Sequence, residues 1–376
     1  MRILQVVAGV APGGGVAESV PRLCLHLQRL GHEVTLATLA GEVSEAVREA
    51  VHGGVRLVQY KRTGLAAFWF SWRMLRELRE ECRGADVVHV HSLWTFPVWW
   101  GCWCAAREGK RLVVSPRGAL DPVRLAHSAW KKRLVGWIDR RCVGWADAVH
   151  ATSEMEAQWC RRWMGEEQCG GEEGDRLAHE PAQDGKVVVV PNGVAYPSGE
   201  LRGAEGEREV KRVIYLGRKH PLKGLDLLEA AWEQVKRPGW ELRVYGVGLA
   251  DGLVEGESKW RVLREAELLV LPSRSESFGI VVAEALAVGL PVITTKGAPW
   301  SELEECGCGW WVEVSVAGLV AALEKAMMLS CKERRVMGEC GRRLVQERYA
   351  WPVVAERMAA VYGEAGTSAS RSEADR

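Results

Sequence analysis

Short apolar runs recur along the chain and alternate with segments whose apolar residues lie at helical spacing. The first run, Arg2–Ala8, precedes Val16–Leu30, whose apolar positions share one face of a helix that Gly31 would end. Further runs of strand length in this half are Glu33–Leu39, Val55–Tyr60, Ala85–Val90, Arg111–Ser115 and Ala146–Thr152, with a helix expected over Trp69–Cys82. This alternation predicts an α/β fold, in which helices cover a parallel sheet.

The same alternation resumes after the polar residues 166–185, which are rich in Gly and Glu and which we interpret as a linker or surface loop. Strands are expected at Lys186–Val190, Val213–Leu216, Glu241–Val244, Glu267–Leu271 and Val292–Thr294. We therefore predict two tandem Rossmann-like, doubly wound domains, 1–165 and 186–350, that face a cleft. A helix over 351–362 is expected to pack back on the first domain, and the small polar residues 363–376 are expected to be a disordered tail.

Composition narrows the class of protein. The chain has 376 residues, 47% apolar and 26% charged, which is long enough for two domains with a core each. No uncharged apolar run reaches 18 residues, and the apolar start is too short for a signal peptide. Eleven scattered cysteines suggest free thiols in a reducing cytoplasm. No metal site is expected, because the two C-x-C pairs lack a second pair at finger spacing, and no nucleic-acid partner is expected.

Charge is distributed unevenly along the chain. Residues 1–165 carry 23 Lys and Arg against 15 Asp and Glu, and they hold 11 of the 18 tryptophans. On a helix over Ala129–Arg141, the apolar side chains Trp130, Leu134, Trp137 and Ile138 would share one face, flanked by cations. Such a face would either pack on the sheet or lie on an anionic membrane surface. The alternative is that Arg is simply frequent in this half and Trp fills its core.

Two carboxylates eight positions apart, Glu276 and Glu284, bracket an apolar segment with a Phe-Gly turn. The run Leu268–Pro272 predicts a buried strand before them, and Ala283–Val288 predicts a helix after it. Glu276 would then lie in the strand-to-helix loop and Glu284 about one turn inside the helix, roughly 12 Å away. Because a helix start favours phosphate, the carboxylates suit the sugar and the ribose on either side of a diphosphate. The alternative is one surface Glu and one ordinary helix Glu.

Glycines and cations follow other predicted strands. Pro12–Gly15 follows the first strand, but it is not the G-x-G-x-x-G fingerprint of dinucleotide-binding proteins. The turn Pro191–Val194 follows the strand at Lys186–Val190. Arg218 and Lys223, each beside a glycine, follow the next strand, where two cations on a loop suit a diphosphate.

Taken together, these residues resemble the retaining, nucleotide-sugar-dependent glycosyltransferases of family 4, which have the two-domain GT-B architecture. The resemblance covers nearly the whole chain, and Val114–Gly118 and Gly297–Trp300 look like a subgroup from bacterial cell-surface polysaccharide clusters. It implies catalytic roles for Arg218, Lys223 and Glu276, with the two cations on the diphosphate and Glu276 on the sugar. Its implied donor-binding residues are Gly14, Gly15, Asn192, Gly193, Ser277, Phe278, Gly279, Ile280, Val281 and, for the ribose, Glu284. Where relatives carry a histidine-containing turn, this chain has Arg117, which, like His91, is a candidate sugar or acceptor contact.

The resemblance also implies an activity. We expect a retaining, metal-independent hexosyltransferase without a cofactor, which moves a sugar from a nucleotide sugar to a lipid-linked or polysaccharide acceptor in cell-surface polysaccharide or lipopolysaccharide synthesis. It would be cytoplasmic and peripheral at the inner face of the membrane. One departure counts against full activity: about a dozen residues join Tyr245–Gly248 to Glu257–Trp260, where relatives have a helix and another strand. A weakly active or non-catalytic donor-binding protein and transfer to a soluble sugar phosphate therefore remain alternatives.

Overall fold

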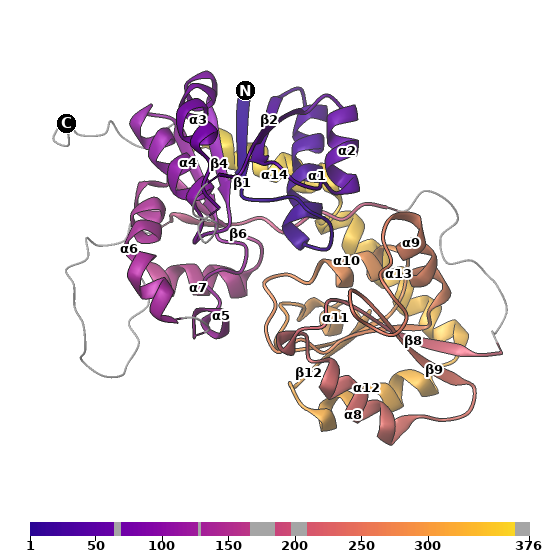
Figure 1. Cartoon of the computed structure of the whole chain (residues 1–376). Helices are drawn as coiled ribbons and strands as arrows, with labels where there is room; N and C mark the ends of the chain where they lie inside the picture. The colour runs from indigo at the N-terminus through magenta and orange to yellow at the C-terminus, as the bar shows by residue number, and fades with distance from the viewer. Residues whose placement is uncertain (64–68, 127–128, 166–184, 197–208, 365–376) are drawn as a thin grey trace. The chain divides into compact units, whose positions relative to one another are not determined.

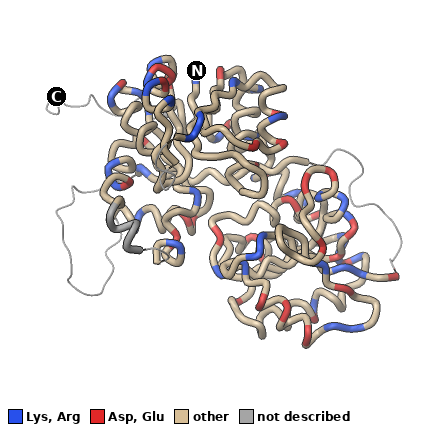
Figure 2. The backbone as a smooth tube through the Cα atoms, in the orientation of Figure 1, with Lys and Arg blue, Asp and Glu red and all other residues tan. Residues whose placement is uncertain are grey.

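The computed structural model describes residues 1–63, 69–126, 129–165, 185–196 and 209–364 (Figure 1). Two compact units divide the chain: Met1–Val190 together with the chain from Ala355, and Pro191–Val354. Each unit is built on its own parallel sheet with helices on both faces, which confirms the predicted fold class. Basic and acidic residues occur on both units (Figure 2). The first half therefore has an excess of cations but is not purely basic, and the second half is not purely acidic.

The sheet of the first unit has seven described strands in the order β3-β2-β1-β4-β5-β6-β7, a doubly wound arrangement. They are β1 (Arg2–Val7), β2 (Glu33–Leu39), β3 (Arg56–Tyr60), β4 (Val87–His91), β5 (Arg111–Ser115), β6 (Ala148–Ala151) and β7 (Val187–Val189). The first six lie within two residues of the predicted positions, because each is an apolar run bounded by turn or polar residues.

Strand β7 corrects the predicted boundary between the domains. The run Lys186–Val190 was expected to begin the second domain, but Val187 pairs with Val149 of β6 and thereby extends the first sheet. A three-residue apolar strand fits the edge of either sheet, so its composition does not reveal which neighbour it pairs with. The chain enters the second unit at Pro191. The predicted linker 166–185 and the tail 363–376 lie almost wholly outside the described residues.

Helices cover both faces of the first sheet. Their bounds are α1 (Gly15–Arg29), α2 (Glu45–His52), α3 (Trp72–Gly84), α4 (Phe96–Arg107), α5 (Pro122–Ala126), α6 (Ala129–Trp145), α7 (Glu154–Met164) and α14 (Trp351–Glu364). Apolar residues of β1, β4 and β5 pack with α3, α4, α6 and α7 in one core cluster. Alternate residues of β1 and β4 point to the opposite face of the sheet. On that face the Tyr362 hydroxyl of α14 accepts a hydrogen bond from Gln5.

The second unit has five described strands in the order β12-β11-β10-β8-β9. They are β8 (Lys211–Leu216), β9 (Trp240–Tyr245), β10 (Leu268–Leu271), β11 (Val292–Thr295) and β12 (Gly309–Val312). Helices α8 (Leu225–Val235) and α12 (Val316–Met328) contribute to one core cluster, and α9 (Gly256–Glu265), α10 (Ile280–Ala287), α11 (Glu302–Glu305) and α13 (Cys331–Arg348) to another. In the part of the chain that the structure describes, no helix is long and apolar enough to cross a membrane.

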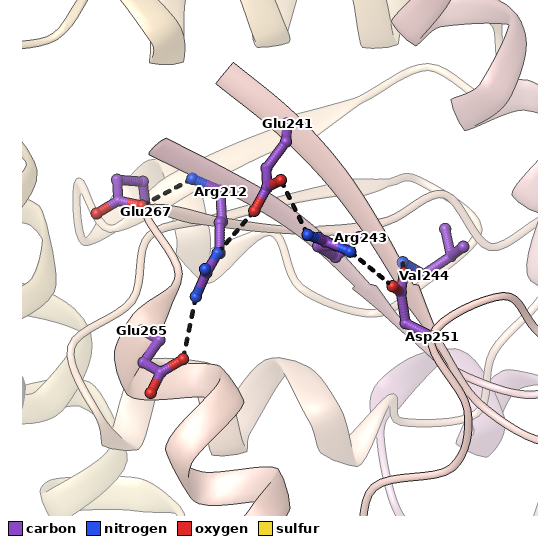
Figure 3. Close-up of polar contacts among 7 residues, drawn as sticks. All are labelled: Arg212, Glu241, Arg243, Val244, Asp251, Glu265 and Glu267. Carbon is purple, nitrogen blue, oxygen red and sulfur yellow. Dashed lines mark hydrogen bonds and ion pairs between the residues drawn. The ribbon is translucent and has the colours of Figure 1, made fainter. Parts of the chain in front are cut away.

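Strand β9 lies at the edge of this sheet, and residues 246–255 lead from it directly to α9. Figure 3 shows the charged side chains that hold this edge. Arg212 on β8 donates to Glu241 on β9 at 2.8 Å, and Arg243 donates to Asp251 at 3.1 Å. The Asp251 carboxylate also accepts from the Val244 backbone N–H at 2.6 Å. The short connection is therefore folded back on the strand that it leaves.

Candidate functional site

The candidate site of the second unit lies where β8 and β10 end, the carboxyl edge at which open parallel sheets bind ligands. Gly217 follows β8, and its N–H donates to the Tyr245 carbonyl of β9 at 3.0 Å. The Tyr215 hydroxyl donates to the Arg218 carbonyl at 3.1 Å. These two bonds hold the backbone on either side of the Gly217–Arg218 peptide at the end of the strand.

Lys223 lies on a tight turn that packs against the end of β10. The turn is the 3₁₀ helix η2 (Pro221–Lys223), where the His220 imidazole accepts from the Leu222 N–H at 3.2 Å. Gly224 closes it with φ 65°, and a Cβ atom there would lie 1.9 Å from the Pro272 carbonyl oxygen. Only glycine permits both the left-handed conformation and this approach, so Gly224 fixes the position of Lys223.

Lys223 and Glu276 form an ion pair, and their side chains are only 19% and 10% exposed. The loop that carries Glu276 is tied to the Lys223 turn by Arg274. The Arg274 N–H donates to the Leu222 carbonyl at 2.8 Å, and its guanidinium donates to Asp226 at 2.7 Å. The structure thus brings together two residues that lie 53 positions apart and that the sequence analysis had selected independently.

The start of α10 completes this part of the site. Gly279 precedes the helix with φ 80°, so the amides of Ile280 and Val281 lie in the first turn, where a helix has no internal acceptors for them. Phe278 is buried against Trp300 and Tyr349, which anchors the Ser277–Gly279 segment to the core. Helix α10 begins three residues earlier than the predicted Ala283–Val288, so Glu284 lies in its second turn.

Glu284 is 4% exposed, and its carboxylate accepts from the Lys259 ammonium of α9 at 2.6 Å. Lys259 was not among the residues predicted from the sequence. Its only signal is its place at the end of the short connection between β9 and α9, because the contact depends on how α9 packs beside α10.

Asn192 and Gly193 lie elsewhere in the second unit. The next residue, Val194, bridges to Ala350, and a Cβ atom on Gly193 would lie 2.3 Å from the Trp351 ring. Close packing against Trp351 therefore explains this glycine without a ligand. In the first unit, a Cβ atom on Gly14 or Gly15 would meet no atom within 4 Å, so packing does not require glycine at either position. The donor-binding roles of all four stay predictions.

His91 and Arg117, the candidate sugar contacts, lie together at the ends of β4 and β5. The Arg117 guanidinium donates to His91 Nδ1 at 3.3 Å, and His91 Nε2 lies 2.6 Å from the Gln5 side-chain oxygen. His91 is fully buried, and this burial lowers its pKa well below the ordinary histidine value. Burial likewise lowers the pKa of Arg117, whose backbone adopts φ 54°. His91 is thus part of a buried network, whereas Arg117 retains partial exposure.

A buried carboxylate that the sequence analysis missed holds the turn of Arg117. Glu156 accepts from the Gly118 N–H with one oxygen, and from the Thr152 N–H and hydroxyl with the other. Glu156 lies three residues after Ser153, which caps α7 through the Glu156 N–H. The Ser-x-x-Glu spacing, typical of a helix start, was the available signal, but it does not predict the bond to Gly118.

Comparison with known proteins gives matches over most of both units. The family described as glycosyl transferase 4-like domain matches residues 14–168, and glycosyl transferases group 1 matches residues 199–344. The chain is 29% identical over 306 residues to D-inositol 3-phosphate glycosyltransferase of Segniliparus rotundus, which covers 63% of this chain and 67% of that protein. It is 26% identical over 388 residues to a GDP-mannose-dependent alpha-mannosyltransferase of Mycolicibacterium smegmatis, with 96% and 97% covered.

A solved structure shares the fold. Anabaena Alr3699/HepE in complex with UDP and glucose matches with a TM-score of 0.71 over 96% of this chain and 99% of that chain, at 16% sequence identity. At this sequence identity the match shows only that the two proteins share a fold.

Proposed function

Because the chain belongs to the family 4 glycosyltransferases with the GT-B fold, we propose that it transfers a sugar from a nucleotide sugar to an acceptor with retention of the anomeric configuration. One observation carries the proposal: Lys223 and Glu276 form a largely buried ion pair between the end of β8 and the start of α10. A cation, a carboxylate and free helix amides at one sheet edge suit a sugar linked to a diphosphate.

Each group of the site has a part in the proposed chemistry. Lys223, Arg218 and the first amides of α10 stabilise the negative charge that develops on the leaving diphosphate. Glu276 accepts hydrogen bonds from sugar hydroxyls, and Glu284 accepts them from the ribose. The leaving phosphate takes the acceptor proton on the face that it vacates, so the new bond forms with the original configuration. With the positive charge supplied by side chains and a helix, the step needs no metal ion.

For the acceptor, we propose a lipid-linked or polysaccharide chain of the cell surface. The bacterial polysaccharide-cluster motifs at Val114–Gly118 and Gly297–Trp300 support this class. An amphipathic helix α6 would bring the enzyme to the inner face of the membrane: Trp137 is 65% exposed, beside Arg140 and Arg141, whereas Ile138 packs on the core. The side chains of 129–134, including Trp130 and Leu134, lie outside the described residues. A soluble sugar phosphate is the alternative acceptor.

A direct test is release of nucleotide from a panel of UDP-, GDP-, ADP- and TDP-sugars by the purified protein. The Lys223→Ala variant should lose at least about a hundredfold in turnover, since a lost charge-stabilising contact costs roughly 3 kcal/mol of barrier. Lys236→Ala is the matched control, because Lys236 pairs with Glu233 at the far end of α8. Equal turnover by wild type and Lys223→Ala would contradict the site.

A second candidate function, binding of a nucleotide sugar without transfer, is favoured by the edge position of β9. Relatives are expected to carry one more strand there, which helps to seat the base. In the test, the protein is given each nucleotide sugar together with an acceptor lipid extract. If it binds nucleoside diphosphates but releases no nucleotide in any of these mixtures, binding without transfer is its function.

A further inference from the structure

The short connection after β9 brings a lysine to the carboxylate that is proposed to bind the ribose. Asp251 holds the connection to Val244, and Glu255 then caps α9 by a reciprocal capping box with Ser258. Lys259 therefore lies in the first turn of a helix whose start is held by the Asp251 bond and by the capping box. Its ammonium donates to Glu284 at 2.6 Å.

Both members of this pair are largely withdrawn from water, with side chains 16% exposed for Lys259 and 6% for Glu284. A buried carboxylate needs a partner that offsets its lost hydration. Lys259 supplies that charge, and by holding one carboxylate oxygen it restricts the rotation of the group. A carboxylate has about four acceptor positions, so one carboxylate can bind a lysine and ribose hydroxyls together.

We propose that Lys259 is a specificity-determining residue of the nucleoside site, which orients Glu284 toward the ribose diol. This inference rests on the proposed donor site, because it assigns a ligand to Glu284. Lys259 acts through Glu284 and is in that sense a positioning residue. Its effect falls on recognition of the 2′-hydroxyl and not on the departing phosphate.

The test is direct binding, measured by titration calorimetry, of UDP, GDP, ADP and their 2′-deoxy forms to the full chain. In the wild type, the ribose form of the preferred nucleotide should bind at least about tenfold more tightly than its deoxy form, the worth of one charge-assisted hydrogen bond. Lys259→Met should weaken the ribose form roughly tenfold and bring the ratio close to one. Lys259→Arg should restore most of the ratio.

Matched controls separate this role from a structural one. Lys236→Met removes the same side chain from the exposed Lys236–Glu233 pair, and it should change neither affinity nor ratio. A Lys259→Met protein that keeps its melting temperature and also the wild-type ratio would overturn the inference and leave the proposed function standing. If Lys259→Met does not fold, Lys259→Gln provides the same comparison. If the wild type binds no nucleotide at millimolar concentration, the proposed function fails together with the inference.

Discussion

Lowering the pH from 7.5 to 5.5 should destabilise the first unit through three buried histidines. His89, His91 and His150 are at most 2% exposed, and burial lowers the pKa of each, for His150 to about 3. When folding depresses the pKa of a histidine, stability is full above the ordinary value of about 6.5 and is lost as the pH falls below it.

The hydrogen bonds explain why these rings stay neutral. Arg117 donates to Nδ1 of His91, so Nε2 of His91 carries the proton and donates to Gln5. The Gln5 amide donates to the Tyr362 hydroxyl, which donates to Nδ1 of His89 at 2.6 Å.

The chain of bonds continues in the same direction. Nε2 of His89 donates to the Ser115 hydroxyl at 2.7 Å, which donates to Nδ1 of His150 at 2.6 Å. Nε2 of His150 donates to the Val190 carbonyl at 2.8 Å. Every Nδ1 thus accepts a hydrogen bond, and a further proton on any ring would place two donors against each other.

The size of the effect follows from the number of groups. At pH 5.5 each fully buried histidine that folding keeps neutral costs about 1.4 kcal/mol, so the three together cost about 4 kcal/mol. Burial also lowers the pKa of the half-buried His26, to about 4, which adds a smaller loss in the same direction. Asp139 acts in the opposite sense, because burial raises its pKa to about 6. The folded protein takes up a proton there as the pH falls, which returns about 0.8 kcal/mol at pH 5.5. The expected net loss is at least about 3 kcal/mol, out of the roughly 5–15 kcal/mol typical of a domain.

Hydrogen exchange read peptide by peptide is the suitable assay, because the second unit contains none of these histidines and serves as an internal reference. After correction for the intrinsic pH dependence, core amides of β4 and β5 should exchange roughly a hundredfold faster at pH 5.5 than at 7.5. His150→Gln should reduce this pH dependence by about a third. His52→Gln, at an exposed histidine of the same unit outside the chain of bonds, is the control variant. A change below about threefold, or an equal change in both units, would refute the reasoning.

Three further predictions concern the proposed activity. Glu276→Gln should lower turnover at least about a hundredfold with the fold intact, and near-normal turnover would contradict its place on the sugar. Activity should survive EDTA, and full loss that Mg²⁺ or Mn²⁺ restores would contradict the metal-free chemistry. The protein should sediment with anionic vesicles at low salt and be released at high salt. Trp137→Ser should weaken this binding, and equal binding to neutral vesicles would show that the charge bias is only compositional.

The sequence predicted the bounds of the strands well, because an apolar run marks its own ends. It did not predict which strands pair. Glu33–Leu39 and Arg111–Ser115 were predicted with the bounds that β2 and β5 have, because each run ends at a change to turn or polar residues. The run Lys186–Val190 was predicted as a strand but placed in the wrong sheet. Strand pairing is decided by neighbours such as Val149, and no local pattern records it.

The site shows the same division. Lys223 and Glu276 could be selected because residue types and glycines mark loops at strand ends, and parallel strands bring such loops to one edge. Lys259 and Glu156 could not be selected, since their partners Glu284 and Gly118 lie 25 and 38 positions away on other elements. Gly193 was selected for a ligand, and packing against the Trp351 ring also requires glycine there, so its donor-binding role stays a prediction.

The family resemblance leads us to expect a further strand beside β9, and its absence from the described residues need not abolish transfer, because β9 and the proposed chemistry lie on different sides of β8. Lys223 and Glu276 are held by η2, the end of β10 and the Arg274 contacts, none of which involves β9. The loss falls on the β9 side, where the nucleoside would bind and where Asp251 now closes the edge. Shortening should therefore weaken donor binding more than the rate of transfer from bound donor. The same short connection leads to the start of α9, where Lys259 pairs with Glu284, the proposed ribose ligand.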